Sequence, residues 1–227
     1  RALSETDYDC TLFHARHGLK SLDGERIISR EVFNVDGVRV VSLSILPYIK
    51  VQSLARILGW IHFEVKLFFM KTNDLPPPDY IVASSLSLLS ILNGLILRWR
   101  FKSKLIFEVR DVWPLVLIEN GGYHPWNPFV LALRLVEWMG YKYSDQIVAT
   151  MPNLAPHVNN VLGYSRKVHC IPMGISDELL NETKVPLPSD LESQFPENKF
   201  IVTYVGSIGV DNALDVFFET VRLFQDN

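Results

Sequence analysis

Three charged side chains and an indole lie close together in the segment FEVRDVWP, residues 107–114. Glu108, Arg110 and Asp111 fall within four positions, and Trp113 follows just before a proline. Open α/β sheets bind their ligands outside the carboxyl ends of their strands, so these charges would lie where such a fold places its chemistry. Arg110 cannot act as a general base, because a guanidinium stays protonated in proteins. The structural alternative is an internal Glu108–Arg110 ion pair with Trp113 as a cover on the core.

Short apolar runs alternate with helical patterns, and these elements must position the charged segment. The expected strands are 10–15, 38–44, 80–84, 104–110, 146–150, 167–172 and 200–206. The expected helices are 50–71, 85–99, 127–143, 152–162 and 211–225. The strand segments are nearly continuous apolar runs, as in strands that are covered on both faces. The alternation predicts an α/β fold with a parallel sheet, in which Glu108 and Arg110 share one face of their strand.

The alternating pattern fails between residues 175 and 199, which are acidic, contain three prolines and show little apolar periodicity. We therefore expect a Rossmann-like domain at 1–176, a linker at 177–199, and the first strand–helix unit of a second domain at 200–227. The chain begins with Arg1 and stops inside a helical pattern, so we expect it to be a fragment.

Composition limits the possible partners. The 227 residues are 48% hydrophobic with a formal net charge of -3, which argues against nucleic acid as a partner of the chain. Cys10 and Cys170 lie far apart and in no CxxC pair, which argues against a disulfide scaffold or a zinc site. The long apolar run 81–97 contains four serines and Asn93, so a strand followed by a buried helix explains it better than a membrane span.

Four segments together resemble family 4 glycosyltransferases in their order and spacing: FEVRDVWP, YKYSDQIVATMPNL, KVHCIPMGIS and VTYVGSIGVDNALD. The resemblance covers nearly the whole chain and is closest to the bacterial branch that builds cell-surface polysaccharides. It implies the GT-B fold, in which two Rossmann-like domains face each other across a cleft. It also implies a retaining glycosyltransferase that moves a sugar from a nucleotide-diphosphate donor, with UDP as the expected nucleotide, to a lipid-linked glycan.

The resemblance assigns roles to the charged segment. Asp111 would face the cleft near the acceptor, while Glu108 and Arg110 would hold that corner or touch the acceptor. Many relatives carry His where this chain has Arg110, so the general-base role is in doubt here. The leaving phosphate could itself take the acceptor proton, and the protein would then supply positioning and electrostatic stabilisation.

The glycine-containing loop at the start of the expected second domain would bind the donor. Gly206 and Gly209 separate a strand from a helix, where glycines let the backbone approach a phosphate and the helix N-terminus offers free N–H groups. The resemblance implies that Gly206, Ser207 and Gly209 contact the diphosphate; a plain strand-to-helix turn is the alternative. Unlike many relatives, this loop has no Arg or Lys. The donor is a substrate, and neither a cofactor nor a metal is expected.

A lipid-linked acceptor implies a cytoplasmic enzyme that is peripheral on the inner face of the cell membrane. The segment 50–71 carries a stripe at helical spacing: Val51, Leu54, Leu58, Ile61, Val65 and Phe68. Further apolar residues lie off this stripe, so the helix either buries two faces or docks on anionic lipid. The cluster Arg98, Arg100, Lys102 and Lys104 is either an ordinary helix C-terminus or a membrane-facing patch.

Other candidate residues favour structural interpretations. Asp7 and Asp9 resemble a DxD metal motif, but they precede a strand, which is typical of a turn. His14 and His17 lack a third metal ligand. Segment 150–154 is expected to cap a helix, and segment 171–176 to lead into the linker.

Two alternatives to a transferase stay open: a nucleotide-sugar 2-epimerase of the same fold, and a non-catalytic α/β binding module. Because the paired-glutamate motif of the donor domain is not reached, the fragment by itself is expected to be inactive.

Overall fold

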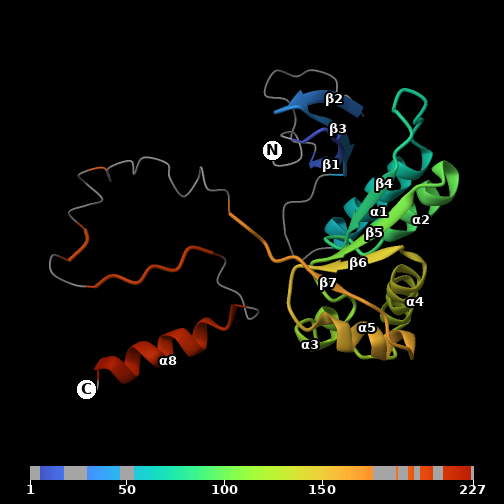
Figure 1. The fold of residues 1–227 in the computed structure, drawn as a ribbon. Coiled ribbons are helices and arrows are strands. Elements are labelled where there is room, and N and C mark those ends of the chain that lie inside the picture. Colours follow the sequence, from blue (N-terminus) through green and yellow to red (C-terminus); the bar gives the residue numbers. More distant parts are fainter. Residues whose placement is uncertain are drawn as a thin grey trace.

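The computed structural model describes residues 6–17, 30–46, 54–175, 188, 194–196, 200–206 and 212–225. These residues form two sheets and a set of helices (Figure 1). The first sheet contains β1 (Thr11–His17), β2 (Arg30–Val35) and β3 (Val38–Ile45), in the order β1-β3-β2. Strand β1 is parallel to β3, and β2 is antiparallel to it.

Strand β2 is an element that the sequence analysis did not predict. Asp36 and Gly37 join it to β3, and both have positive φ values, 48° and 82°. Such a pair is the mark of a tight two-residue hairpin turn, for which Asp-Gly is a preferred sequence. The Asp-Gly pair between two short apolar runs was therefore the available signal for β2.

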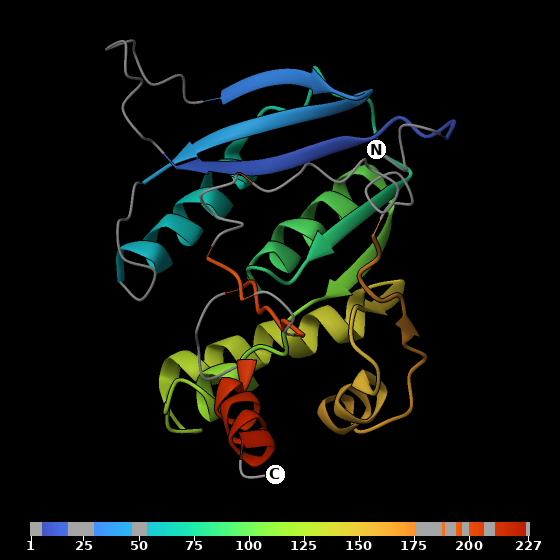
Figure 2. The same ribbon diagram turned by 90° about the vertical axis from the view of Figure 1, so that its left-hand side faces the viewer.

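The second sheet confirms the predicted parallel α/β arrangement. Strands β4 (Tyr80–Ser84), β5 (Lys104–Val109), β6 (Gln146–Ala149) and β7 (His169–Cys170) pair in that order, all parallel. Helices α2 (Ser90–Phe101), α4 (Pro128–Tyr143) and α5 (Leu154–Leu162) connect them, with a short α3 (Leu115–Glu119) after β5. Helix α1 (Leu54–Phe69) leads from the first sheet to the second and contacts both β3 and α2 (Figure 2).

The main core lies between the second sheet and its helices. Leu105, Phe107 and Val109 alternate along β5 and are almost completely buried. Gly140 of α4 lets the helix approach closely, since a Cβ atom there would lie 2.8 Å from Cε1 of Phe107. Helices α4 and α5 are also joined by a polar contact: the buried Glu137 carboxylate lies 2.7 Å from Nε2 of His157.

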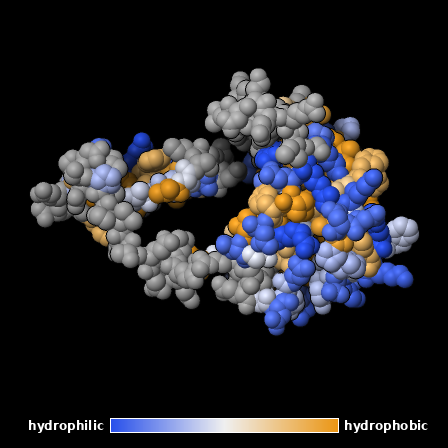
Figure 3. Space-filling view, turned by 90° about the horizontal axis from the view of Figure 1, so that it is seen from above, coloured by the Kyte–Doolittle hydropathy of each residue, from blue (hydrophilic) through white to orange (hydrophobic). Residues whose placement is uncertain are grey.

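One face of the second sheet is buried in the core, but the side chains on its other face are much less covered. This differs from the expectation that its strands are buried on both faces. On β4, Tyr80 is 63% exposed and Val82 61% exposed, whereas Ala83 is buried. Within the described residues, β1 and β4 also pair along one side only. Apolar side chains reach the molecular surface among polar ones on the face that Figure 3 shows.

The carboxyl-terminal part departs from the prediction. Residues 200–206, expected to be a strand, form no strand in the structure, and β7 spans only two of the six residues predicted. Helix α8 (Leu214–Gln225) forms where a helix was predicted and lies apart from the sheets (Figure 1). Most of the expected linker lies outside the described residues, so the proposed domain boundaries stay predictions.

Asp145, just before β6, ties three elements together at the amino ends of the strands. Its carboxylate accepts a hydrogen bond from the Leu105 backbone N–H at 2.8 Å and pairs with Arg98 Nε at 3.0 Å. Arg98 also donates to the Tyr143 carbonyl. Partial burial raises the pKa of Asp145, but the Leu105 N–H and the Arg98 guanidinium outweigh this, so the pKa lies below its ordinary value.

We expect Asp145→Asn to lower the free energy of unfolding by about 1–3 kcal/mol at neutral pH, because partly buried donors lose a charged acceptor. A depressed pKa stabilises the fold above the unfolded-state pKa, and this contribution is lost as the pH falls through the folded-state pKa. The deficit of the variant should therefore shrink below about pH 4. Urea unfolding measures it, with the exposed Asp79→Asn as the control; equal stability of the two variants would contradict the prediction.

Candidate functional site

The charged segment lies at the carboxyl edge of the second sheet, as the sequence predicted. Glu108 is the next-to-last residue of β5, and Arg110 and Asp111 follow the strand. Glu108 pairs in register with Ser84 of β4 and Val148 of β6. Asp111 is exposed, whereas Glu108 and Arg110 are half-buried. A carboxylate open to solvent is therefore held beside two more enclosed charged side chains.

Ser85, immediately after β4, fixes the backbone of this segment. Its side chain is fully buried, and its Oγ accepts hydrogen bonds from the backbone N–H groups of Arg110 at 2.9 Å and Asp111 at 3.2 Å. The same hydroxyl lies 3.2 Å from the Asp111 carbonyl oxygen, to which it can donate. The Ser85 N–H donates to the Glu108 carbonyl at 2.9 Å. One side chain thus sets the course of the chain through the candidate site.

Sequence analysis missed the role of Ser85, because a serine at a strand end has no signal of its own. The contact joins residues 25 and 26 positions apart, and only the pairing of β4 with β5 brings them together. The position of Ser85 after the last paired residue of a predicted strand was the one available clue.

Trp113 packs on the core, as the structural alternative proposed, but the Glu108–Arg110 ion pair of that alternative is not formed. The Trp113 ring packs against the main core and meets the Trp60 ring edge to face, with centroids 6.0 Å apart. Its Nε1 atom is buried without a hydrogen-bond partner. Among the described residues, Glu108 and Arg110 form no ion pair with each other, so neither charge is neutralised by the other.

Glu64 of α1 lies one helical turn after Trp60 and is a buried carboxyl that sequence analysis did not single out. Its Oε2 atom accepts a hydrogen bond of 2.6 Å from Nδ2 of Asn93, and its Oε1 atom is buried without a partner. Burial raises the pKa of Glu64 from 4.5 to about 7, and the neighbouring Asn93 amide and Ser87 hydroxyl offset only part of this rise. The Glu64 carboxyl therefore gains or loses its proton near neutral pH.

The loops after β6 and β7 reach the same edge of the sheet. Thr150 N–H donates to the Val109 carbonyl at 3.2 Å, and Ile171 N–H donates to the Ala149 carbonyl at 2.8 Å. Asn153 occupies the residue before α5, but its side chain forms no capping hydrogen bond, which corrects the capping role expected for 150–154. Met173 is 69% exposed beside this edge.

The remaining candidates do not assemble into a site. Asp7 lies in a turn ahead of β1, and His14 is exposed on β1. Within the described part of the chain, no group of three or more His, Cys, Asp or Glu side chains could hold a metal ion. Gly206 is exposed, while Ser207 and Gly209 lie outside the described residues, so the donor-side contacts stay predictions.

Comparison with known proteins adds no family assignment. No protein-family model matches this chain, and no curated protein matches it. The functional interpretation therefore depends on the four sequence segments and on the geometry of the carboxyl edge.

We expect Ser85→Ala to lower the free energy of unfolding by about 1–3 kcal/mol, because two partly buried backbone N–H groups lose their acceptor. The matched control is Ser84→Ala, since the Ser84 hydroxyl is buried without a partner and its removal leaves no donor unpaired. Urea unfolding at one pH compares the two variants. A loss in Ser84→Ala as large as in Ser85→Ala would contradict the positioning role.

We expect the stability of the chain to fall as the pH rises through about 7, because Glu64 must then ionise inside the fold. A carboxyl with a raised pKa contributes stability that is full below its unfolded-state pKa and lost above its folded-state pKa. A rise from 4.5 to about 7 corresponds to roughly 3 kcal/mol at most.

The neutral variant Glu64→Gln keeps the size of the side chain and removes its titration. It should be more stable than the original chain at about pH 8 and should show a flatter stability profile from about pH 5 to 8. Thermal unfolding across this range measures both. Parallel profiles for the two chains would exclude a raised pKa at Glu64.

Proposed function

We propose that this chain forms the acceptor-side part of a retaining glycosyltransferase, together with the start of the donor-side domain. The observation that carries the proposal is the arrangement at the carboxyl edge of a parallel sheet. There, Ser85 holds the backbone of Arg110 and Asp111, and the Asp111 carboxylate is open to solvent. This is the edge at which open α/β folds bind their ligands.

In this proposal, the three charged residues position and stabilise instead of exchanging protons. Asp111 accepts hydrogen bonds from hydroxyl groups of the acceptor, and Arg110 supplies a fixed positive charge near the departing diphosphate. Glu108 has no ion-pair partner among the described residues and orients the same acceptor from the strand end. The leaving phosphate takes the acceptor proton, so the site needs no histidine before Asp111.

The donor in this proposal is a nucleotide-diphosphate sugar, with UDP as the expected nucleotide. Gly206, Ser207 and Gly209 contact its diphosphate through backbone N–H groups at the start of the following helix. No metal ion takes part in the proposed reaction. The acceptor is a lipid-linked saccharide that stays at the membrane surface.

Membrane attachment in this proposal uses the outer face of α1. Leu58, Ile61, Val65 and Phe68 are each between 42% and 54% exposed, whereas Phe63, Leu67 and Met70 pack toward the first sheet. Four residues of the predicted apolar stripe thus face outward, while α1 also packs against β3 and α2, as the interpretation with two buried faces expected. No described helix is both long and apolar enough to cross a membrane. We propose a peripheral position on the inner face of the cell membrane.

The basic cluster at the end of α2 contributes fewer free cations than its sequence indicated. Arg98 is engaged by Asp145 and the Tyr143 carbonyl, and Lys104 lies 3.7 Å from the same carboxylate. Arg100 and Lys102 are the exposed cations that stay available to an anionic surface.

We expect Asp111→Asn to reduce transfer by about 10²- to 10³-fold, because a positioned charge in an active site contributes about 2–4 kcal/mol to the barrier. The assay follows sugar from a labelled UDP-sugar into lipid extract, using the full-length protein. Asp79→Asn is the control, since this exposed carboxylate precedes β4 at the opposite edge of the sheet. An unchanged rate in Asp111→Asn, with unchanged melting, would remove Asp111 from the site. Conversion of the donor without any acceptor would indicate an epimerase.

A further inference from the structure

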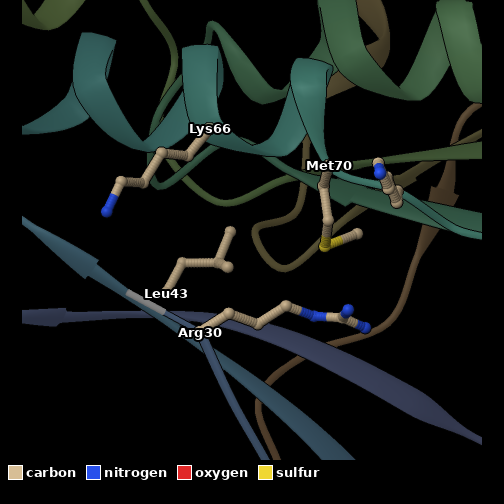
Figure 4. Close-up of a pocket in the computed structure, with 5 residues that line it drawn as sticks. Arg30, Leu43, Lys66 and Met70 are labelled. Carbon is tan, nitrogen blue, oxygen red and sulfur yellow. The ribbon is translucent and has the colours of Figure 1, made fainter. Parts of the chain in front are cut away.

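A hollow of about 290 Å³ lies between α1 and the first sheet, away from the candidate site. Five residues line it: Arg30, Leu43, Lys66, Met70 and Lys71. Three of the five carry a positive charge, although they come from β2, α1 and the residues after α1. Figure 4 shows Arg30 and Lys66 extending on either side of Leu43 and Met70, so the hollow has charged flanks and an apolar middle.

Positive charge exceeds negative charge around this hollow. Arg30 Nη2 pairs with Oδ2 of Asp74 at 2.7 Å, and Asp74 is itself 55% exposed. The hydrogen bond from Arg30, followed by the nearby charges of Arg30 and Arg39, keeps the pKa of Asp74 below its ordinary value. Asp74 thus lies near Arg30 and Arg39, and no carboxylate is among the five described residues that line the hollow.

Arg30 and Arg39 each have a buried donor without a partner among the described residues. These donors are Arg30 Nε and Arg39 Nη1. Leaving a buried donor unpaired is costly, and the cost is greater for a charged group. Lys66 donates to the Ser44 carbonyl at 2.6 Å and can make two more hydrogen bonds. Of the residues that line the hollow, Lys66 and Lys71 therefore offer donors to an oxyanion directly, and Arg30 adds a guanidinium beside them.

The hollow borders the exposed apolar face of α1. Lys66 follows Val65 of this face, and Lys71 follows the exposed Phe68 and Phe69, whose rings meet edge to face at 4.8 Å. Aromatic and aliphatic side chains beside a row of cations are typical of a helix that lies in a membrane interface. An anion reaching this hollow from a bilayer would lie beside the inserted face of the helix.

We propose that this hollow binds the phosphate of an anionic membrane lipid when α1 lies on the bilayer. Guanidinium and ammonium groups at its flanks hydrogen-bond the phosphate oxygens, and the glycerol and first methylene groups cover Leu43 and Met70. The site rests on the proposed function only in placing this chain at a membrane. It shifts the main lipid contact from the basic cluster at the end of α2 to Arg30, Lys66 and Lys71.

The test measures binding of the full-length protein to vesicles of phosphatidylcholine, with and without phosphatidylglycerol. Lys71→Gln removes a cation whose side chain makes no described contact, so its fold should be intact. Arg30→Gln removes the guanidinium, and Asp74→Asn removes the competing carboxylate. Arg134→Gln is the matched control, because this exposed arginine lies on α4, which α2 separates from α1.

We expect Lys71→Gln and Arg30→Gln each to weaken binding to phosphatidylglycerol vesicles about fivefold, with Arg134→Gln unchanged. Asp74→Asn should strengthen binding, because it frees Arg30. Binding to pure phosphatidylcholine should not distinguish these variants. Equal binding of Lys71→Gln and Arg134→Gln would overturn the proposal, as would weaker binding of Asp74→Asn.

Soluble glycerol 1-phosphate separates a lipid site from a site for free phosphate. If glycerol 1-phosphate displaces the protein from phosphatidylglycerol vesicles, the proposal is supported. If the protein binds glycerol 1-phosphate but does not bind the vesicles, the lipid assignment is overturned. Transfer to a lipid-linked acceptor presented in detergent needs no bilayer. That assay therefore tests the proposed function independently of this hollow.

Discussion

The parallel pairing of β4, β5, β6 and β7 is the constraint on which the rest of the structure depends. Parallel strands all end at one edge, so each chain segment that leaves a strand there meets its neighbours. The Ser85 hydroxyl can reach the backbone of Arg110 and Asp111 only because β4 ends beside β5. The opposite edge is closed by Asp145, which holds the start of β5 and the end of α2.

Helix α1 shows how far tertiary contacts decide the role of an amphipathic sequence. The helix carries apolar residues on all of its sides, so periodicity alone does not determine which face is buried. The first sheet presents Val41 and Leu43, and these select Phe63, Leu67 and Met70 as the buried set. Glu64 is then carried into the interface with α2, where Asn93 supplies one hydrogen bond. The orientation of α1 on the first sheet thus has two results: it exposes one apolar face of the helix, and it buries Glu64, which raises the pKa of that carboxyl.

Elements with a strong local pattern were predictable from the sequence. Strand β4 has the predicted limits, β5 ends one residue early, and α1, α4 and α8 lie within the predicted helices. Strand β2 was missed because its main signal is the Asp36–Gly37 turn, and its own apolar run is short and interrupted by polar residues. Residues 200–206 are apolar enough for a strand but form none among the described residues, since a strand also needs a partner.

The candidate site was predictable in position but not in construction. The charges of Glu108, Arg110 and Asp111 mark the end of β5 in the sequence itself. Ser85 and Trp60 reach that corner from distant segments, and neither has a distinctive local signal. The absent Glu108–Arg110 ion pair was also not deducible, because strand alternation places two side chains on one face without fixing their contact.

The single-sided pairing of β1 and β4 has a consequence for how this chain behaves in solution. Among the residues that the structure describes, each strand has one side without a paired strand, and such an edge can template the addition of another extended chain. Three prolines and Asp79 precede β4 and disfavour strand pairing there. The sequence of β4 itself, YIVAS, contains neither a charge nor a proline. Because its own Tyr80 and Val82 side chains are exposed, β4 makes the colloidal stability of the chain depend on whether another polypeptide segment covers this edge.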